Sequence, residues 1–93
     1  PSAERVRFTS SGTEATLMAC RIARMVTGRP KVMKLTGHFH GWHDFLVPTA
    51  YAPYGGPDPA TPGIAPGVLA DVVSIPPHDL DRLEQGLRDH QPA

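Results

Sequence analysis

Cysteine is nearly absent from this sequence, since Cys20 is the only one among 93 residues. A single thiol excludes an internal disulfide framework and favours a reducing, cytoplasmic setting. An excess of charge is also missing, because nine basic and nine acidic residues cancel. Nucleic acid and anionic membrane surfaces are therefore not expected as main partners, which leaves small molecules and other proteins.

Long hydrophobic runs are missing as well. No apolar stretch approaches the roughly 20 residues that a membrane span needs. The chain opens at Pro1, without a methionine and without a charged segment followed by an apolar one, so we expect no signal peptide and interpret the sequence as an excerpt of a longer chain. With 40% hydrophobic and 19% charged residues, it has the composition of a soluble globular protein with a modest core.

The spacing of apolar residues predicts the elements of an α/β protein. Alternation and β-branched residues predict short strands at residues 5–9, 31–35 and 71–75. Helical spacing predicts an amphipathic helix over residues 13–26 and a second helix whose stripe is Leu80, Leu83 and Leu87. Strand, helix and strand over residues 5–35 predict a parallel βαβ unit with a right-handed crossover.

Two further patterns concern packing and connection. The first helix carries its apolar residues on one face, which we expect to lie against a sheet, with small side chains permitting a close approach: Ala15, Met18, Ala19, Ala23, Ile22 and Val26. Ten of the twenty residues in 48–67 are Gly or Pro, which predicts a long loop without regular structure. The whole chain is thus interpreted as one partial α/β domain.

The turn Ser10-Ser11-Gly12-Thr13 stands where a strand is expected to end and a helix to begin. The first backbone N–H groups of a helix and its dipole favour an anion there, Gly12 permits close approach, and the hydroxyl groups of Ser11 and Thr13 add donors. Such a turn suits a phosphate group. The alternative is that Ser11 only caps the helix, with Glu14 completing a capping box.

Several stretches together resemble the class-III pyridoxal-phosphate aminotransferases: residues 8–15 (FTSSGTEA), 21–24, 27–29, 31–34 and 37–41 (GHFHG). Residues 42–44, 61–64 and 71–73 carry the likeness further, toward the glutamate-1-semialdehyde aminomutase group of that family. The resemblance implies that residues 1–93 are a fragment of the cofactor-binding large domain of a fold-type I enzyme. That domain has three αβα layers and a mostly parallel sheet.

The resemblance also implies a cofactor, pyridoxal 5′-phosphate, and the residues that contact it. Ser11, Gly12 and Thr13 would hold the phosphate, Phe39 would stack on the pyridine ring, and His40 would lie beside that stack. Phe39 departs from the tyrosine that is commoner in the family, which removes a phenol but keeps the flat face for stacking. Thr36 stands where related sequences often carry glutamate.

No catalytic residue is assigned in this chain. By the resemblance, the lysine that forms the Schiff base and the aspartate that pairs with the pyridine nitrogen lie further along a family member. Lys31 and Lys34 match strand positions instead, and we expect them to be solvated or strand-end charges. The parent enzyme would move an amino group between an amine donor and a carbonyl substrate, as an aminotransferase or aminomutase and as a homodimer. The isolated fragment is expected to be inactive.

Two other functions stay open from the residues alone. His38, His40 and His43, with Asp44, have a spacing that zinc ligands can have, which makes a metal-binding hydrolase the rival enzyme class. A non-catalytic interaction module is the third hypothesis, with the Pro-rich loop around Tyr51 and Tyr54 as its surface. Trp42, beside the histidines, is interpreted as buried packing or subunit contact.

Overall fold

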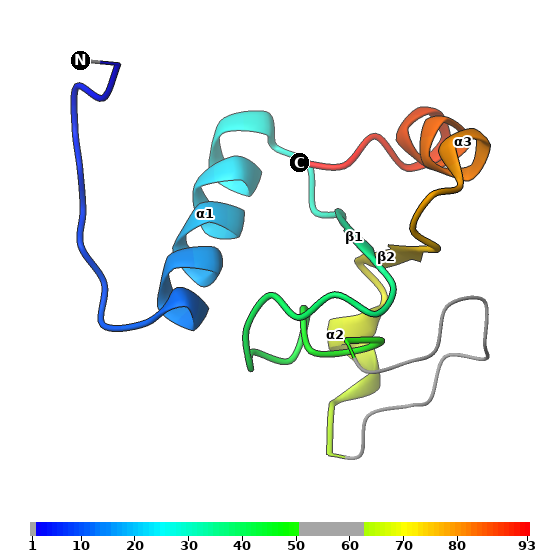
Figure 1. Ribbon diagram of the computed structural model, residues 1–93, viewed down its shortest axis with the longest axis horizontal. Coiled ribbons are helices and arrows are strands. Elements are labelled where there is room, and N and C mark those ends of the chain that lie inside the picture. Colours follow the sequence, from blue (N-terminus) through cyan, green and yellow to red (C-terminus); the bar gives the residue numbers. More distant parts are fainter. Residues whose placement is uncertain (1, 51–62) are drawn as a thin grey trace.

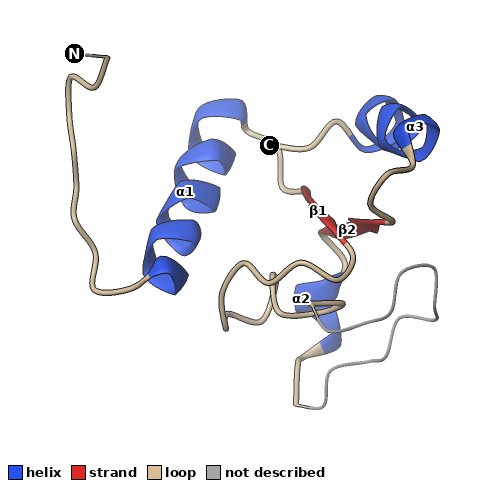
Figure 2. Cartoon of the chain, viewed as in Figure 1, coloured by secondary structure: helices blue, strands red, loops and turns tan. Residues whose placement is uncertain are grey.

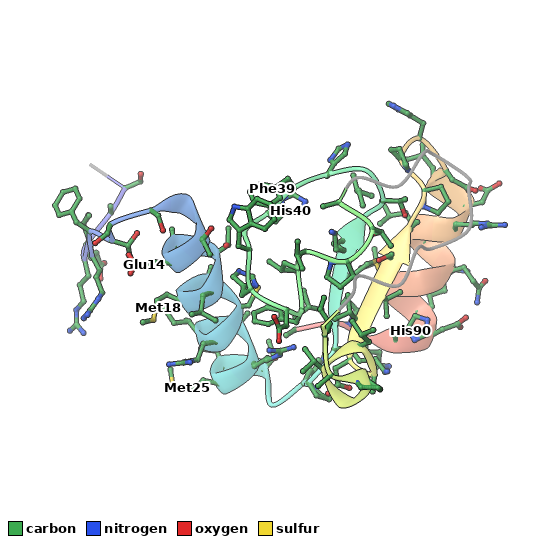
Figure 3. The ribbon with its side chains drawn as sticks, turned by 90° about the horizontal axis from the view of Figure 1, so that it is seen from below. Glu14, Met18, Met25, Phe39, His40 and His90 are labelled. Atoms are coloured by element: carbon green, nitrogen blue, oxygen red, sulfur yellow. The ribbon has the colours of Figure 1, made fainter. Side chains whose placement is uncertain are left out.

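The structure is a computed structural model, and it describes residues 2–50 and 63–93. The described elements follow one another along the chain (Figures 1 and 2) as α1 (Gly12–Thr27), β1 (Val32–Leu35), α2 (Pro66–Leu69), β2 (Val72–Ile75) and α3 (Leu80–His90). Figures 1 and 3 both show α1 and α3 on opposite sides of the two strands. The predicted α/β class is confirmed.

The strands β1 and β2 pair in parallel, with Val32 opposite Val72 and Leu35 opposite Ile75. The ladder continues past their ends, because the N–H of Val32 donates to Asp71 at 2.8 Å and the N–H of Thr36 donates to Ile75 at 2.8 Å. β-Branched residues suit such a pleated pair. The strands predicted at residues 31–35 and 71–75 are therefore confirmed.

The strand predicted at residues 5–9 does not form, and the βαβ unit predicted over residues 5–35 is wrong in this structure. The segment runs outside α1 and away from β1 (Figure 1), and its side chains are exposed, with Val6 at 68% and Phe8 at 91%. A strand needs a neighbour that takes up its backbone hydrogen bonds. Residues 5–9 have none among the described residues.

Helix α1 forms where predicted and extends one residue further at each end. Ser11 caps its start in an extended conformation, and Gly28 ends it at φ 68°, where its N–H donates to Arg24 at 2.9 Å. A left-handed glycine at this position releases the chain from the helix without a Cβ clash.

The face of α1 that the sequence assigned to a sheet is mostly turned to solvent. Ile22 is 56% exposed and Val26 is 75% exposed, whereas Thr16 and Leu17, which are not part of that face, are half-buried. Figure 3 shows Met18 and Met25 pointing away from the strands. The prediction failed because α1 lies against the loop that follows β1. Side chains that form hydrogen bonds make this contact, so the apolar face is not needed for it.

Helix α3 covers one face of the strands through a glycine. A Cβ on Gly86 would lie 2.8 Å from Cδ1 of Ile75 and 2.9 Å from Cε of Met33, so a larger residue here would require the ends of these two side chains to shift. Leu83 is half-buried, while Leu80 is 75% exposed and does not join the predicted stripe. The buried hydrophobic residues gather around the strands and the turn after β1: Leu46, Val47, Ala50 and Ile75.

The loop predicted at residues 48–67 is described only at its two ends. Residues 48–50 form a buried turn, and the loop's last two residues, Pro66 and Gly67, open α2 rather than continuing as a coil. Proline at the first position of a helix loses no hydrogen bond, which explains the difference. Tyr51 and Tyr54 lie outside the described residues. Within residues 2–50 and 63–93, no helix is both long and apolar enough to cross a membrane.

Candidate functional site

The start of α1 is capped by its own side chains. The Oγ of Ser11 accepts from the N–H of Glu14 at 3.2 Å, and the Glu14 carboxylate accepts from the N–H of Ser10 at 2.6 Å. The cap predicted for Ser11 is confirmed, although the carboxylate takes the N–H of Ser10 instead of that of Ser11. Capping satisfies two of the donors at the helix end and leaves others for a ligand.

The donors that remain include those of Gly12 and Thr13. Their backbone N–H groups donate to no group among the described residues, and the helix dipole gives this end partial positive charge. A Cβ built on Gly12 would meet nothing within 4 Å, so the space beside it is open. The phosphate-binding role of Ser11, Gly12 and Thr13 stays a prediction, and the free donors agree with it.

The loop of residues 39–43 lies directly on the first turns of α1. The N–H of Trp42 donates to Oγ1 of Thr13 at 3.4 Å, and Oγ1 of Thr16 donates to the carbonyl of His40 at 2.6 Å. Gly41 makes this approach feasible: it is buried at φ 124°, and a Cβ there would lie 3.1 Å from both Cα of Thr13 and Oγ1 of Thr16. Residues far apart in the sequence thus meet at the helix start.

Phe39 and Trp42 form an edge-to-face pair on this loop, with ring centroids 5.1 Å apart and an interplanar angle of 64°. Phe39 is 44% exposed and Trp42 is 66% exposed. Trp42 is therefore not the buried packing residue that its type suggested, because the tight turn at Gly41 directs it outward. The exposed part of Phe39 leaves ring surface for a flat ligand, so its stacking role stays a prediction.

His40 lies beside Phe39 on the loop that follows β1 (Figure 3). Burial lowers the pKa of His40, and the positive charges of Lys34 and His38 lower it further. The rings of His38 and His40 are tilted, with centroids 6.2 Å apart. His40 is thus held neutral at physiological pH, as a hydrogen-bonding group rather than a cation.

His43 points to α1 rather than to the other histidines. Its Nε2 lies 3.0 Å from Oγ1 of Thr16, and its ring stacks on Phe45 at a centroid distance of 4.2 Å. Burial lowers the pKa of His43 in spite of the opposing charge of Asp44. Among residues 2–50 and 63–93, no three His, Cys, Asp or Glu side chains are grouped to hold a metal ion, so the hydrolase alternative gains no support.

Lys34 departs from its predicted role. It is only 5% exposed, and its Nζ donates to the carbonyls of Leu46 and Pro48 at 2.6 Å each. The prediction of a solvated charge is wrong because alternation along β1 turns this side chain inward, over the buried turn. Lys31, by contrast, lies 4.0 Å from the carboxylate of Asp71 at the strand end, as predicted.

The structure therefore brings the predicted phosphate residues and the predicted ring-facing residues onto one side of the chain. Sequence reasoning missed the two residues that join them, Thr16 and Gly41. A threonine one turn into an amphipathic helix, among apolar neighbours, was the available signal for Thr16. A glycine within a histidine-rich loop was the signal for Gly41, since a close backbone approach requires glycine.

No protein-family model matches the chain. Curated relatives do match along almost all of it. The chain is 47% identical over 90 residues to glutamate-1-semialdehyde 2,1-aminomutase of Symbiobacterium thermophilum. The aligned region covers 94% of this chain and 20% of that protein. The enzymes of the same name from Aquifex aeolicus and Methanocaldococcus jannaschii are 41% and 40% identical, over 97% and 98% of this chain. The chain spans about a fifth of the length of these relatives.

Solved structures agree with the sequence relatives. An omega-transaminase from Sphaerobacter thermophilus superposes with a TM-score of 0.84 at 38% identity, over 98% of this chain and 22% of its own. A transaminase with PLP bound also superposes with a TM-score of 0.84, at 41% identity over 94% of this chain and 20% of its own. Over nearly its whole length, the chain is similar to a segment of these transaminases. The predicted resemblance to class-III aminotransferases, and the fold that it implied, are confirmed.

Proposed function

We propose that this chain supplies the phosphate-binding turn and the ring-facing loop of a pyridoxal-phosphate-dependent aminotransferase or aminomutase. One observation carries the proposal: residues 39–43 are hydrogen-bonded to the first turns of α1, where the N–H groups of Gly12 and Thr13 have no partner among the described residues. A phosphate and an aromatic ring joined by a short linker would thus find both of their contacts in one place. Residues 1–93 would be part of the cofactor-binding large domain.

The residues present suit the phosphate group chemically. Gly12 and Thr13 offer backbone N–H groups, and the hydroxyl groups of Ser11 and Thr13 keep a hydrogen to donate while accepting their present bonds. Glu14 is the only acidic side chain in the turn, and its carboxylate is directed to the N–H of Ser10. A phosphate dianion at Gly12 and Thr13 would accept hydrogen bonds from the backbone N–H groups at the start of the helix.

The loop residues suit the ring. Phe39 offers a flat face that restrains an aromatic ligand without a polar group of its own, and Trp42 supports Phe39 edge-on. His40, neutral because burial and Lys34 lower its pKa, can donate or accept one hydrogen bond beside the ring. When bound, pyridoxal phosphate supplies the electron sink on which amino-group transfer depends.

For the whole protein we propose amino-group transfer between an amine donor and a carbonyl substrate. The names of the relatives support this reaction class, as does their 38–47% identity to this chain. In that protein α1 and the loop would anchor and orient the cofactor, while the acid–base chemistry falls to residues outside this chain. A homodimer in a reducing, cytoplasmic setting fits the exposed Trp42 and the single cysteine.

The test uses pyridoxine 5′-phosphate, which has the ring and phosphate but no aldehyde and so cannot react with lysine side chains. Trp42 is the only tryptophan, and its emission reports binding on the loop. We expect saturable quenching that Thr13→Val weakens by about tenfold, because a hydrogen bond to a charged group is lost. Thr13→Ser keeps the hydroxyl and should bind like the parent chain.

Two ligand controls separate the parts of the site. Inorganic phosphate should compete for the helix start, and pyridoxine without phosphate should bind much more weakly than its phosphate ester. Equal affinity for pyridoxine and pyridoxine 5′-phosphate would overturn the proposed phosphate role. Stoichiometric zinc binding without any response to the phosphate ester would favour the histidine alternative.

A further inference from the structure

The hydroxyl of Thr16 is the point at which α1 and the loop are joined. Its Oγ1 lies 2.6 Å from the carbonyl of His40 and 3.0 Å from Nε2 of His43, and 3.1 Å from the carbonyls of Gly12 and Thr13 in its own helix. A hydroxyl has one hydrogen to donate. The shortest of these contacts is the one to His40, so that hydrogen goes to the loop.

The geometry then assigns the proton of His43. Since Oγ1 of Thr16 donates to His40, it accepts from His43, and Nε2 must carry the hydrogen. The other ring nitrogen, Nδ1, is buried and has no hydrogen-bond partner among the described residues. A buried lone pair costs less than a buried N–H, which favours the same neutral tautomer.

The neighbours of His43 hold its ring in place. One side of the ring stacks on Phe45 at an interplanar angle of 27°, and the guanidinium of Arg24 from α1 lies 4.9 Å from the centroid of Phe45. Gly41 is buried beside this ring, and a Cβ built on it would lie only 3.1 Å from Nε2 of His43. The contact between Thr16 and His43 is therefore a fixed junction rather than a surface contact.

We infer that Thr16 and His43 are positioning residues of the proposed cofactor site. They fix residues 39–42 over the first turn of α1, so that Phe39 faces a ring whose phosphate is held by Gly12 and Thr13. Neither side chain touches the ligand. The inference rests on the proposed function for its ligand, while the junction itself is testable without one.

The first test compares two matched variants of Thr16. Thr16→Val keeps the branched shape and removes the hydroxyl, whereas Thr16→Ser keeps the hydroxyl. Thr27→Val is the control at the other end of α1, where the hydroxyl donates to Ala23 at 2.8 Å, accepts from the N–H of Arg29 at 3.2 Å, and makes no hydrogen bond to residues 39–43. All three should keep the helical circular dichroism of the parent chain, because threonine and valine have similar helix propensities.

We expect Thr16→Val to lose selectively the part of the binding affinity that comes from the pyridine ring of the ligand. Its affinity for inorganic phosphate should stay within twofold, since Gly12 and Thr13 are unchanged, whereas its affinity for pyridoxine 5′-phosphate should fall by about fivefold to tenfold. A general loss of folding would lower both affinities together. An unchanged ratio of the two affinities in Thr16→Val would overturn the inference.

The second test concerns His43 and does not depend on a cofactor. His43→Gln places an amide N–H within reach of Thr16, whereas His43→Leu fills the space without a donor. The emission maximum and acrylamide quenching of Trp42 should change in His43→Leu and in Thr16→Val, and should be restored in His43→Gln. Identical Trp42 emission in all variants would contradict the junction between Thr16 and His43. If the parent chain does not bind pyridoxine 5′-phosphate, that result would contradict the proposed function alone.

Discussion

Residues 5–9 and residues 32–35 are both short stretches that the sequence predicts as strands, yet only the second is a strand. The later stretch lies beside β2 and exchanges backbone hydrogen bonds with it, from Val32 to Leu35. The earlier stretch runs along the outside, where Phe8 is 91% exposed. The sequence pattern shows which side chains a segment is able to bury. Whether the segment forms a strand depends on a neighbouring strand that pairs with it.

The same contrast separates α1 from α3. Helix α3 packs on the strands through Gly86 and Leu83, while α1 keeps its apolar face in solvent and is bonded to the loop by Thr13 and Thr16. The buried hydrophobic residues therefore lie in the strands and in the turn of residues 46–50, which pack with α3, whereas α1 carries the candidate site. We call these two parts the packed region and the site region.

The largest expected difference between the regions concerns two isoleucines. Ile75 in β2 is 4% exposed, so Ile75→Ala should lower the free energy of unfolding by about 3 kcal/mol through lost contacts and a cavity. Ile22 in α1 is 56% exposed, and Ile22→Ala should change stability by less than about 0.5 kcal/mol. Urea unfolding at low protein concentration measures both. Equal losses would mean that α1 is packed against something in solution.

Two lysines near β1 sharpen the comparison. Lys34→Met removes the donor for the carbonyls of Leu46 and Pro48 inside the packed region, and it should cost about 2 kcal/mol. Lys31→Met removes an exposed ion pair with Asp71 and should cost less than about 1 kcal/mol. The difference between the two urea midpoints is the measurement. A larger loss for Lys31→Met would contradict the burial of Lys34.

The smallest effect expected is a dependence of stability on pH. Burial lowers the pKa of His40 and His43 in the folded chain below the unfolded value, which is about 6.5. The unfolded chain therefore binds more protons below about pH 6.5, and stability is complete above that pH and falls as the pH is lowered. The urea midpoint should drop between about pH 7.5 and pH 5.5.

A matched variant isolates these two histidines from the other titratable groups. The double variant His40→Gln and His43→Gln keeps hydrogen-bonding side chains that do not titrate, so its midpoint should vary less over the same pH range. If the double variant and the parent chain lose the same stability, the lowered pKa values of His40 and His43 are not what links pH to folding.

Local patterns predicted the elements well and their neighbours poorly. The Ser11 cap and the Gly28 end of α1 are set by nearby residues, so the helix was predictable. Which face of α1 is covered depends on the loop at Gly41, whose path follows from contacts with residues more than twenty positions away. The burial of Lys34 also depends on contacts outside its own strand, with the carbonyls of Leu46 and Pro48, which are 12 and 14 positions away.

For the candidate site, the resemblance identified the predicted ligand-facing residues, and the structure added how they are joined. Ser11, Gly12, Thr13, Phe39 and His40 were all named from the sequence. Thr16 was passed over because its role lies in a hydrogen bond to a loop carbonyl, which no spacing rule records.

The most direct test of the central claim is a titration of the ¹⁵N-labelled chain, followed through its backbone amide signals. With inorganic phosphate we expect the largest shifts at the N–H groups of Gly12 and Thr13, which have no hydrogen-bond acceptor among the described residues. With pyridoxine 5′-phosphate the same amides should shift, and those of residues 39–42 should join them. Shifts confined to other residues, with Gly12 and Thr13 unmoved by either ligand, would contradict the account.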